Sequence, residues 1–333
     1  MKELIKRLVE TYGPSGSEDQ IRKAILEEVR PYVDEARVDP LGNLIAVKHA
    51  AKGNGGKKIM LAGHMDEIGV MVTHIDEKGF LRFGGIGGIS PQILLGERVV
   101  FADGTVGIVG VERLDDPKDL RFDKLFIDIG AKDKAQAEKA VGIGWSAGYY
   151  RTFDDLGDRL VSKAMDDRIG CAVMIQAAKE LKKTPNEVYF VFTVQEEVGL
   201  RGARTSAFAV DPDIGIAIDV TRTGDTPKGL PMAVELGGGA AIKVKDSSLV
   251  AHPKVKDLMA EVARTDKIPY QFEVLEAGGT DAGAIHLTKA GVPSGTISIP
   301  TRYIHTPSEV VDYGDVQACV RLLKGIVGRP IGL

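Results

Sequence analysis

The chain has 333 residues, which is enough to bury a sizeable core and to form more than one domain. Its 44% hydrophobic and 27% charged residues are typical of globular proteins. A net charge of -4 and apolar runs far too short to cross a bilayer argue against a nucleic-acid or membrane partner. The first residues lack the apolar segment of a signal peptide, so we expect a cytoplasmic protein.

The N-terminal part of the chain is predicted to alternate between helices and strands. Apolar residues at helical spacing predict helices over 1–11 and 18–30, separated by Gly13-Pro14-Ser15-Gly16. Strands are expected at 33–38 and 43–47, a glycine-rich loop at 53–56, and a buried strand at 58–62. That last strand leads directly into His64 and Asp66.

The pattern changes between residues 70 and 155, where short β-like pieces alternate with glycine-rich turns. The expected strands are 69–75, 80–83, 98–101, 107–109 and 124–128, with one helix at 133–141. We therefore predict an inserted β-rich domain over residues 70–156, within a discontinuous catalytic domain of residues 1–69 and 157–333.

Beyond Leu160 the alternation of helices and strands resumes. Helices are expected at 167–181, 201–208, 253–265, 281–290 and 315–327, and strands at 188–194, 214–218, 240–244, 270–274 and 295–299. This order predicts an α/β fold with a mixed sheet flanked by helices and interrupted by the β insert.

Polar side chains follow four of the buried strands. They are His64 and Asp66, the pair Glu196-Glu197, Asp219, and His305, and Asp166 adds a further carboxylate just before a helix. Open α/β sheets place their sites at the carboxyl ends of such strands. Because adjacent side chains diverge, Glu196 and Glu197 are expected to have different tasks, one binding a metal and the other handling a proton.

Two histidines and several carboxylates suit zinc, cobalt or manganese. An iron–sulfur or thiolate site would need more cysteines than Cys171 and Cys319, which fit no CxxC pattern. A shared carboxylate lets two metals sit about 3.5–4 Å apart. Taken singly, each residue has an ordinary interpretation: a core histidine for His64, a turn residue for Asp219, a helix N-terminal acid for Asp166, a surface residue for His305. The interpretation as a site depends on the complete set.

The set of motifs resembles the tetrahedral aminopeptidase family of dinuclear-metal peptidases, some members of which bear the name endoglucanase. The matching motifs are Ala62-Gly63-His64-Met65-Asp66-Glu67-Ile68-Gly69, Ala164-Met165-Asp166-Asp167-Arg168, Gln195-Glu196-Glu197-Val198-Gly199, Ala217-Ile218-Asp219-Val220-Thr221, Gly278-Gly279-Thr280-Asp281-Ala282 and Arg302-Tyr303-Ile304-His305-Thr306-Pro307-Ser308-Glu309. They run in family order over nearly the whole chain.

The resemblance implies two divalent ions per subunit, zinc or cobalt. His64 and Asp219 would hold one, Glu197 and His305 the other, and Asp166 would bridge them. Glu196 would be the general base and Asp66 would orient His64. It also implies a phosphorylase/hydrolase-like catalytic domain, a β-barrel or PDZ-like dimerisation domain, and a tetrahedral dodecamer built from dimers.

The expected reaction is release of N-terminal residues from short peptides, with Gly278 and Gly279 letting the substrate backbone approach closely. The alternative for these glycines is a plain turn. A metal-independent glucanase using a carboxyl pair is the competing enzyme hypothesis. A cage-forming protein with an inactive site is the non-enzymatic one.

Overall fold

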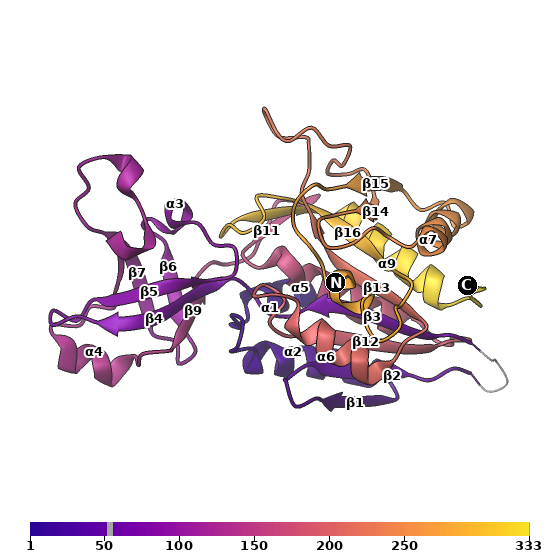
Figure 1. Ribbon diagram of the computed structural model, residues 1–333, viewed down its shortest axis with the longest axis horizontal. Coiled ribbons are helices and arrows are strands. Elements are labelled where there is room, and N and C mark those ends of the chain that lie inside the picture. Colours follow the sequence, from indigo (N-terminus) through magenta and orange to yellow (C-terminus); the bar gives the residue numbers. More distant parts are fainter. Residues whose placement is uncertain (52–55, 333) are drawn as a thin grey trace.

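Within residues 1–51 and 56–332, which the computed structural model describes, the strands form an eleven-stranded mixed sheet and a separate closed barrel. Figure 1 shows the barrel beside the larger helix-covered sheet. The glycine-rich loop expected at 53–56 lies mostly outside the described residues.

The centre of the sheet consists of four parallel neighbours in the order β12, β3, β13 and β16. Their bounds are Glu187–Thr193, Lys58–His64, Ile214–Thr221 and Ser294–Arg302. β13 is buried along its whole length, as expected of a strand that helices cover on both faces of the sheet. Since the four strands run in the same direction, their carboxyl ends meet at one edge.

The remaining strands extend the sheet on both sides. One side carries β2 (Leu44–Lys48) and β1 (Glu35–Val38), and the other carries β17 (Glu309–Asp312), β11 (Arg159–Ser162) and β10 (Asp154–Asp155). A branch leaves β16 through β14 (Ala240–Lys245) and β15 (Tyr270–Val274).

Helices cover both faces of the sheet, because each face is apolar. The larger core lies under α1 (Lys2–Glu10), α2 (Asp19–Val29), α5 (Met165–Glu180), α7 (Pro253–Thr265) and α9 (Tyr313–Val327). The opposite face packs against α6 (Arg201–Val210) and α8 (Ala282–Ile285). The central helix α5 is buried along most of its length and touches the strands that carry the site.

The barrel closes in the order β4, β5, β8, β7, β6 and β9. Their bounds are Gly69–Ile75, Leu81–Ile86, Leu125–Asp128, Val106–Val111, Arg98–Phe101 and Ser146–Tyr149, with the helices α3 (Pro91–Leu94) and α4 (Lys134–Ala140) outside. Alternating residues such as Val70 and Val72 fill an apolar core distinct from that of the sheet. Closure leaves the barrel without free edges.

The predicted α/β fold with a β-barrel insert is confirmed. Four strands were not predicted: Ser146–Tyr149, Asp154–Asp155, Arg159–Ser162 and Glu309–Asp312. The helix expected at 281–290 is wrong beyond its first turn. It ends at Ile285, and the chain then turns through Gly291, whose φ of +103° is unfavourable for other residues. In the part of the chain that the structure describes, no helix is long and apolar enough to cross a membrane.

Candidate metal centre

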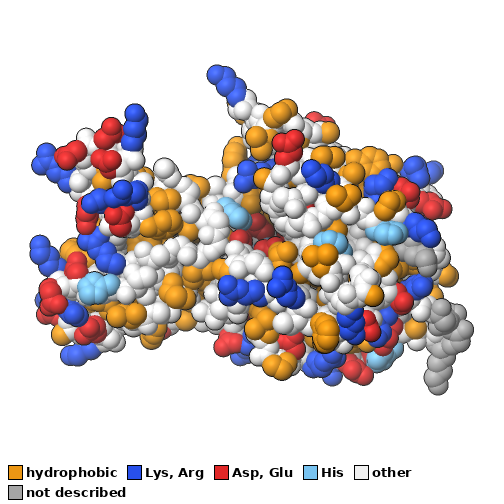
Figure 2. All heavy atoms as spheres, in the orientation of Figure 1, with side chains coloured by type: hydrophobic (Ala, Val, Ile, Leu, Met, Phe, Trp, Pro, Cys, Tyr) orange, Lys and Arg blue, Asp and Glu red, His pale blue; other side chains and the backbone are white. Residues whose placement is uncertain are grey.

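The five predicted ligands meet at the edge formed by the carboxyl ends of the central strands. His64 ends β3, Asp219 lies near the end of β13, Glu197 and His305 follow β12 and β16, and Asp166 lies at the start of α5. All five line one cavity of about 480 Å³, together with Glu196. Figure 2 shows acidic and histidine side chains in a hollow between the barrel and the sheet domain.

The Asp166 carboxylate lies between the two histidines. Its Oδ1 is 3.0 Å from His64 Nε2, and its Oδ2 is 3.3 Å from His305 Nε2. Glu197 Oε2 is also 3.3 Å from His305 Nε2. One carboxylate therefore connects both halves of the site, which is the geometry that a shared ligand requires.

Two groups of side chains are close enough to hold cations. His64, Asp166 and Glu197 form one, and His64, Asp167 and Asp219 form the other, with the ligand atoms of each group within 4.8 Å of one another. Asp167, for which no role was predicted, thus lies close to Asp219 in the second group. Its Oδ2 also accepts a hydrogen bond from the His64 backbone N–H at 3.2 Å.

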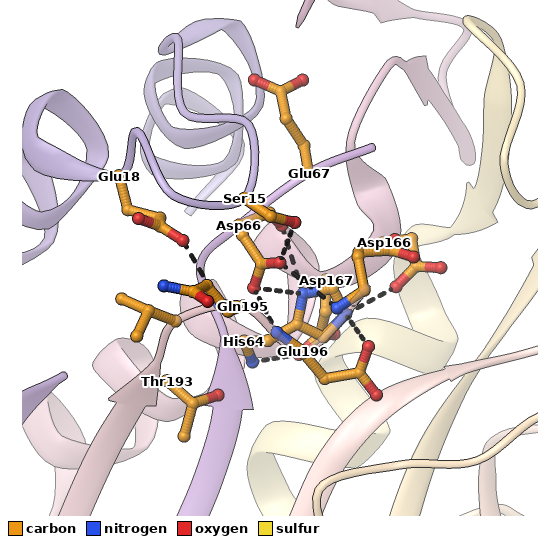
Figure 3. A network of polar contacts seen from close by, with 12 residues as sticks. Ser15, Glu18, His64, Asp66, Glu67, Asp166, Asp167, Thr193, Gln195 and Glu196 are labelled. Carbon is orange, nitrogen blue, oxygen red and sulfur yellow. Dashed lines mark hydrogen bonds and ion pairs between the residues drawn. The ribbon is translucent and has the colours of Figure 1, made fainter. Parts of the chain in front are cut away.

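Asp66 holds both the histidine and the glutamate pair. His64 Nδ1 lies 3.1 Å from the Asp66 backbone oxygen and 3.5 Å from Asp66 Oδ1. The Asp66 carboxylate accepts hydrogen bonds from the backbone N–H of Glu196 (3.0 Å) and Glu197 (3.2 Å) and from the Ser15 hydroxyl (2.6 Å). Figure 3 shows Asp66 between Ser15 and His64, with Glu196 on the other side of the imidazole. A fully buried carboxylate thus fixes the backbone of the predicted base.

Sequence reasoning assigned no role to Glu309, although it lies in one of the motifs. Its two carboxylate oxygens accept hydrogen bonds from the backbone N–H groups of Asp166 (2.9 Å) and His305 (2.7 Å). Glu309 begins β17, which pairs with β16, so the sheet places it beneath the loop that carries His305. The sequence signal was its position four residues after His305, and a partner for it could not be inferred.

The electrostatics of the site are those of crowded buried carboxylates. Burial raises the pKa of Glu196 and of Asp219 well above the usual value, and neighbouring carboxylates add to the effect. Burial opposes the charged form of His305, but Asp166 and Glu197 prevail and raise its pKa to about 11. Burial is thus the main cause for the two carboxyl groups, whereas the negative charge of the cluster is the cause for His305.

The side chains present fit divalent cations. Glu197 Oε1 is buried and has no hydrogen-bond partner among the described residues, which is costly unless another ligand meets it. Imidazole nitrogens and carboxylate oxygens are the donors that zinc, cobalt and manganese accept. Cations at this position would supply the positive charge that the cluster lacks.

The barrel and a glycine-rich loop complete the walls of the cavity. The Gly88 backbone oxygen, in the connection between β5 and α3, lies 3.1 Å from His305 Nδ1. A Cβ on Gly88 would lie only 2.6 Å from that nitrogen. Gly278 and Gly279, which belong to the sheet domain, also line the cavity. Gly278 has a φ of +83°.

The sequence profile described as M42 glutamyl aminopeptidase matches residues 42–322. The chain belongs to the M42 aminopeptidase family. It is therefore an aminopeptidase, and its predicted resemblance to the tetrahedral aminopeptidases is confirmed.

Several M42 relatives match this chain over almost its full length. A candidate aminopeptidase of Acetivibrio thermocellus is 56% identical over 324 residues, covering 97% of each chain. The structure of an aminopeptidase from Desulfurococcus kamchatkensis superposes with a TM-score of 0.93 at 42% identity, covering 98% of this chain and 94% of its own. The TET1 peptidase of Pyrococcus horikoshii superposes with a TM-score of 0.86 at 32% identity, and the superposition covers 98% of each chain. That peptidase can assemble into a tetrahedron or a large octahedral shell.

Proposed function

We propose that this chain is a dinuclear metal-dependent aminopeptidase that releases N-terminal residues from short peptides. The observation that carries the proposal is the position of the Asp166 carboxylate between His64 and His305, in the cavity that Glu196 also lines. His64 and Asp219 would hold one ion, Glu197 and His305 the other, and Asp166 would bridge them. Two divalent cations at these residues would polarise the scissile carbonyl and lower the pKa of water in the site to about 7.

Glu196 is the proton carrier in this proposal. Its carboxylate Oε2 lies 3.9 Å from His64 Nε2, so Glu196 faces the predicted ligands. The proposed ligand set does not include Glu196 itself. Glu196 takes a proton from the water that attacks the scissile carbonyl and then delivers it to the leaving amine. Burial raises the pKa of Glu196 in the metal-free chain, and bound cations would lower it towards the ionised form that the first transfer requires. Asp66 keeps Glu196 in place through its backbone N–H and keeps the His64 ring oriented.

The glycine-rich wall supports peptide binding. Gly278 and Gly279 lack side chains where they face the cavity, so a peptide backbone can approach theirs closely. The Gly278 carbonyl already accepts a hydrogen bond from the Ser247 N–H at 3.2 Å, which holds the wall against the β14 side of the domain.

We further propose that the barrel over residues 70–156 is a dimerisation domain and that the dimers build a tetrahedral dodecamer. Support comes from the assembly of the Pyrococcus horikoshii relative and from exposed apolar residues on the barrel, including Ile108 (54% exposed). Light scattering on the purified protein should give the mass of twelve chains, and a monomeric mass would contradict this assembly.

Chelation and reconstitution test the proposed activity. Removal of divalent ions should abolish hydrolysis of an aminoacyl chromogen such as leucine p-nitroanilide, and added zinc or cobalt should restore it. Metal analysis of the restored protein should give two ions per chain. Undiminished activity in the chelated, metal-free protein would contradict the proposal.

The same experiment separates the competing hypotheses. One similar protein of Thermotoga maritima bears the name endoglucanase. A carboxyl-pair glycosidase would cleave glucan after chelation. An inactive cage protein would bind the ions without hydrolysing either substrate.

A further inference from the structure

The active-site cavity continues into a second cavity beside it. The second cavity has a volume of about 410 Å³ and shares Arg222 and Ile304 with the first. Arg222 directly follows the last residue of β13, three positions after the predicted ligand Asp219. The two cavities therefore adjoin at Arg222, whose side chain is exposed.

Most charged groups around the two cavities already have partners. Arg302 binds the Asp225 carboxylate at 3.0 and 2.6 Å. Lys243 is buried and lies 2.5 Å from Glu273 Oε1 and 3.4 Å from Asp246 Oδ2. These cations are neutralised within the protein and offer no free charge to a substrate.

Arg222 and Lys228 differ from this pattern. Both line the second cavity, and among the described residues neither has an ion-pair or side-chain hydrogen-bond partner. Lys228 lies in the segment between β13 and β14, which projects from the top of the sheet domain in Figure 1. The other residues of this cavity are uncharged apart from Arg302, and several carry hydroxyls: Thr223, Thr226, Thr301 and Tyr303.

We infer that Arg222 binds a carboxylate of the peptide substrate and that Lys228 adds to the attraction. This inference rests on the proposed aminopeptidase function. The planar guanidinium offers paired N–H donors that match a carboxylate, and Arg222 stands at the exit of the catalytic cavity. A di- or tripeptide places its C-terminal carboxylate within a few residues of the scissile bond, at about 3.3–3.6 Å per extended residue. The site would therefore favour short peptides with a free C-terminus.

An acidic N-terminal side chain would supply the same chemistry, so the test uses three matched substrates. Leu-Gly-Gly and its C-terminal amide differ only in the terminal carboxylate, and Glu-Gly-Gly amide carries one on its first side chain. The wild-type protein should hydrolyse the free acid with kcat/KM about tenfold above that of the amide. In Arg222→Gln the ratio of kcat/KM for the free acid to that for the amide should fall towards one. In Arg222→Lys this ratio should lie between the values of the wild-type protein and of Arg222→Gln.

Arg321→Gln is the matched control, because Arg321 is exposed on α9 and lines neither cavity. It should leave the acid-to-amide ratio at its wild-type value. A preference for the glutamyl amide that Arg222→Gln removes would support carboxylate binding and assign it to the N-terminal side chain. Equal rates on all three substrates, or ratios unaffected by Arg222→Gln, would overturn the inference.

Leucine p-nitroanilide separates this result from failure of the proposed function. It has no carboxylate, so its hydrolysis by the wild-type protein tests the aminopeptidase activity alone. Hydrolysis of the chromogen with an acid-to-amide ratio of one refutes only the role of Arg222. A metal-loaded protein that cleaves neither the chromogen nor any peptide refutes both.

Discussion

Glu196 and Glu197 are neighbours in the chain, and the structure gives them different surroundings. Gln195 adopts a φ of +55°, so the chain turns sharply as it leaves β12. Asp66 then accepts a hydrogen bond from the N–H of each glutamate, and their side chains diverge. Glu197 reaches His305, and Glu196 approaches His64. A single buried carboxylate thus holds adjacent residues in the different positions that the proposed ligand and the proposed base require.

Glu196→Gln tests this division at the level of one residue. The amide keeps the volume of the side chain but cannot take up the proton, so kcat should fall by about 10²–10⁴-fold. Metal content, measured by elemental analysis of the purified variant, should remain that of the wild-type protein. A variant that loses metal would show that Glu196 is a ligand, and the base would have to be sought elsewhere.

At the scale of elements, the barrel contributes a backbone carbonyl to the candidate metal centre. The connection from β5 to α3 brings the Gly88 carbonyl to His305 Nδ1, so an element from one hydrophobic core orients a side chain attached to the other. The hydrogen bond fixes which ring nitrogen faces Asp166 and Glu197.

Gly88→Ala should therefore weaken metal binding. Its Cβ would lie 2.6 Å from His305 Nδ1, and the displaced ring should bind metal about 10–100-fold more weakly, as measured by competition with a chelator of known affinity. Gly84→Ala is the control, because Gly84 lies in β5 just before this connection and its Cβ would meet only one described atom within 4 Å, at 3.9 Å. Equal metal affinity in both variants would mean that Gly88 does not position His305.

At the scale of the whole molecule, the metal centre should make stability depend on pH. In the metal-free chain, burial raises the pKa of Glu196, Asp219 and Glu309, and carboxylates raise the pKa of His64 and His305 against the opposing effect of burial. Between about pH 5 and pH 8 the folded chain thus holds more protons than the unfolded chain, and stability must fall as pH rises. Asp66 and Asp166, whose pKa is lowered, titrate below this window.

Thermal unfolding of the chelated protein measures this effect. Its Tm should be lower at pH 8 than at pH 5. In the metal-loaded protein the difference should shrink, because the cations take the place of the protons. A metal-free Tm that rises over this range would show that the carboxylate cluster does not govern the stability of the fold.

Much of this architecture could be predicted because local pattern and final environment agree. The apolar run before Glu196 became a buried strand, and the parallel direction of β12, β3, β13 and β16 brought the strand ends together. The contributions of Glu309, Gly88 and Arg222 could not be predicted, because they depend on contacts between segments far apart in the chain. The strands around Val161 and Val310 were missed because each has only two apolar residues, with a polar residue on either side.

The distribution of the site along the chain has a consequence for how the protein matures. The predicted ligands belong to five segments, from β3 near the N-terminus to the loop after β16, and the barrel must also dock to bring Gly88 to His305. Each of these contacts closes a long loop, so they form late in folding. In the proposed centre, metal loading would therefore mark a completely folded chain, because nascent or truncated chains would lack some of the predicted ligands.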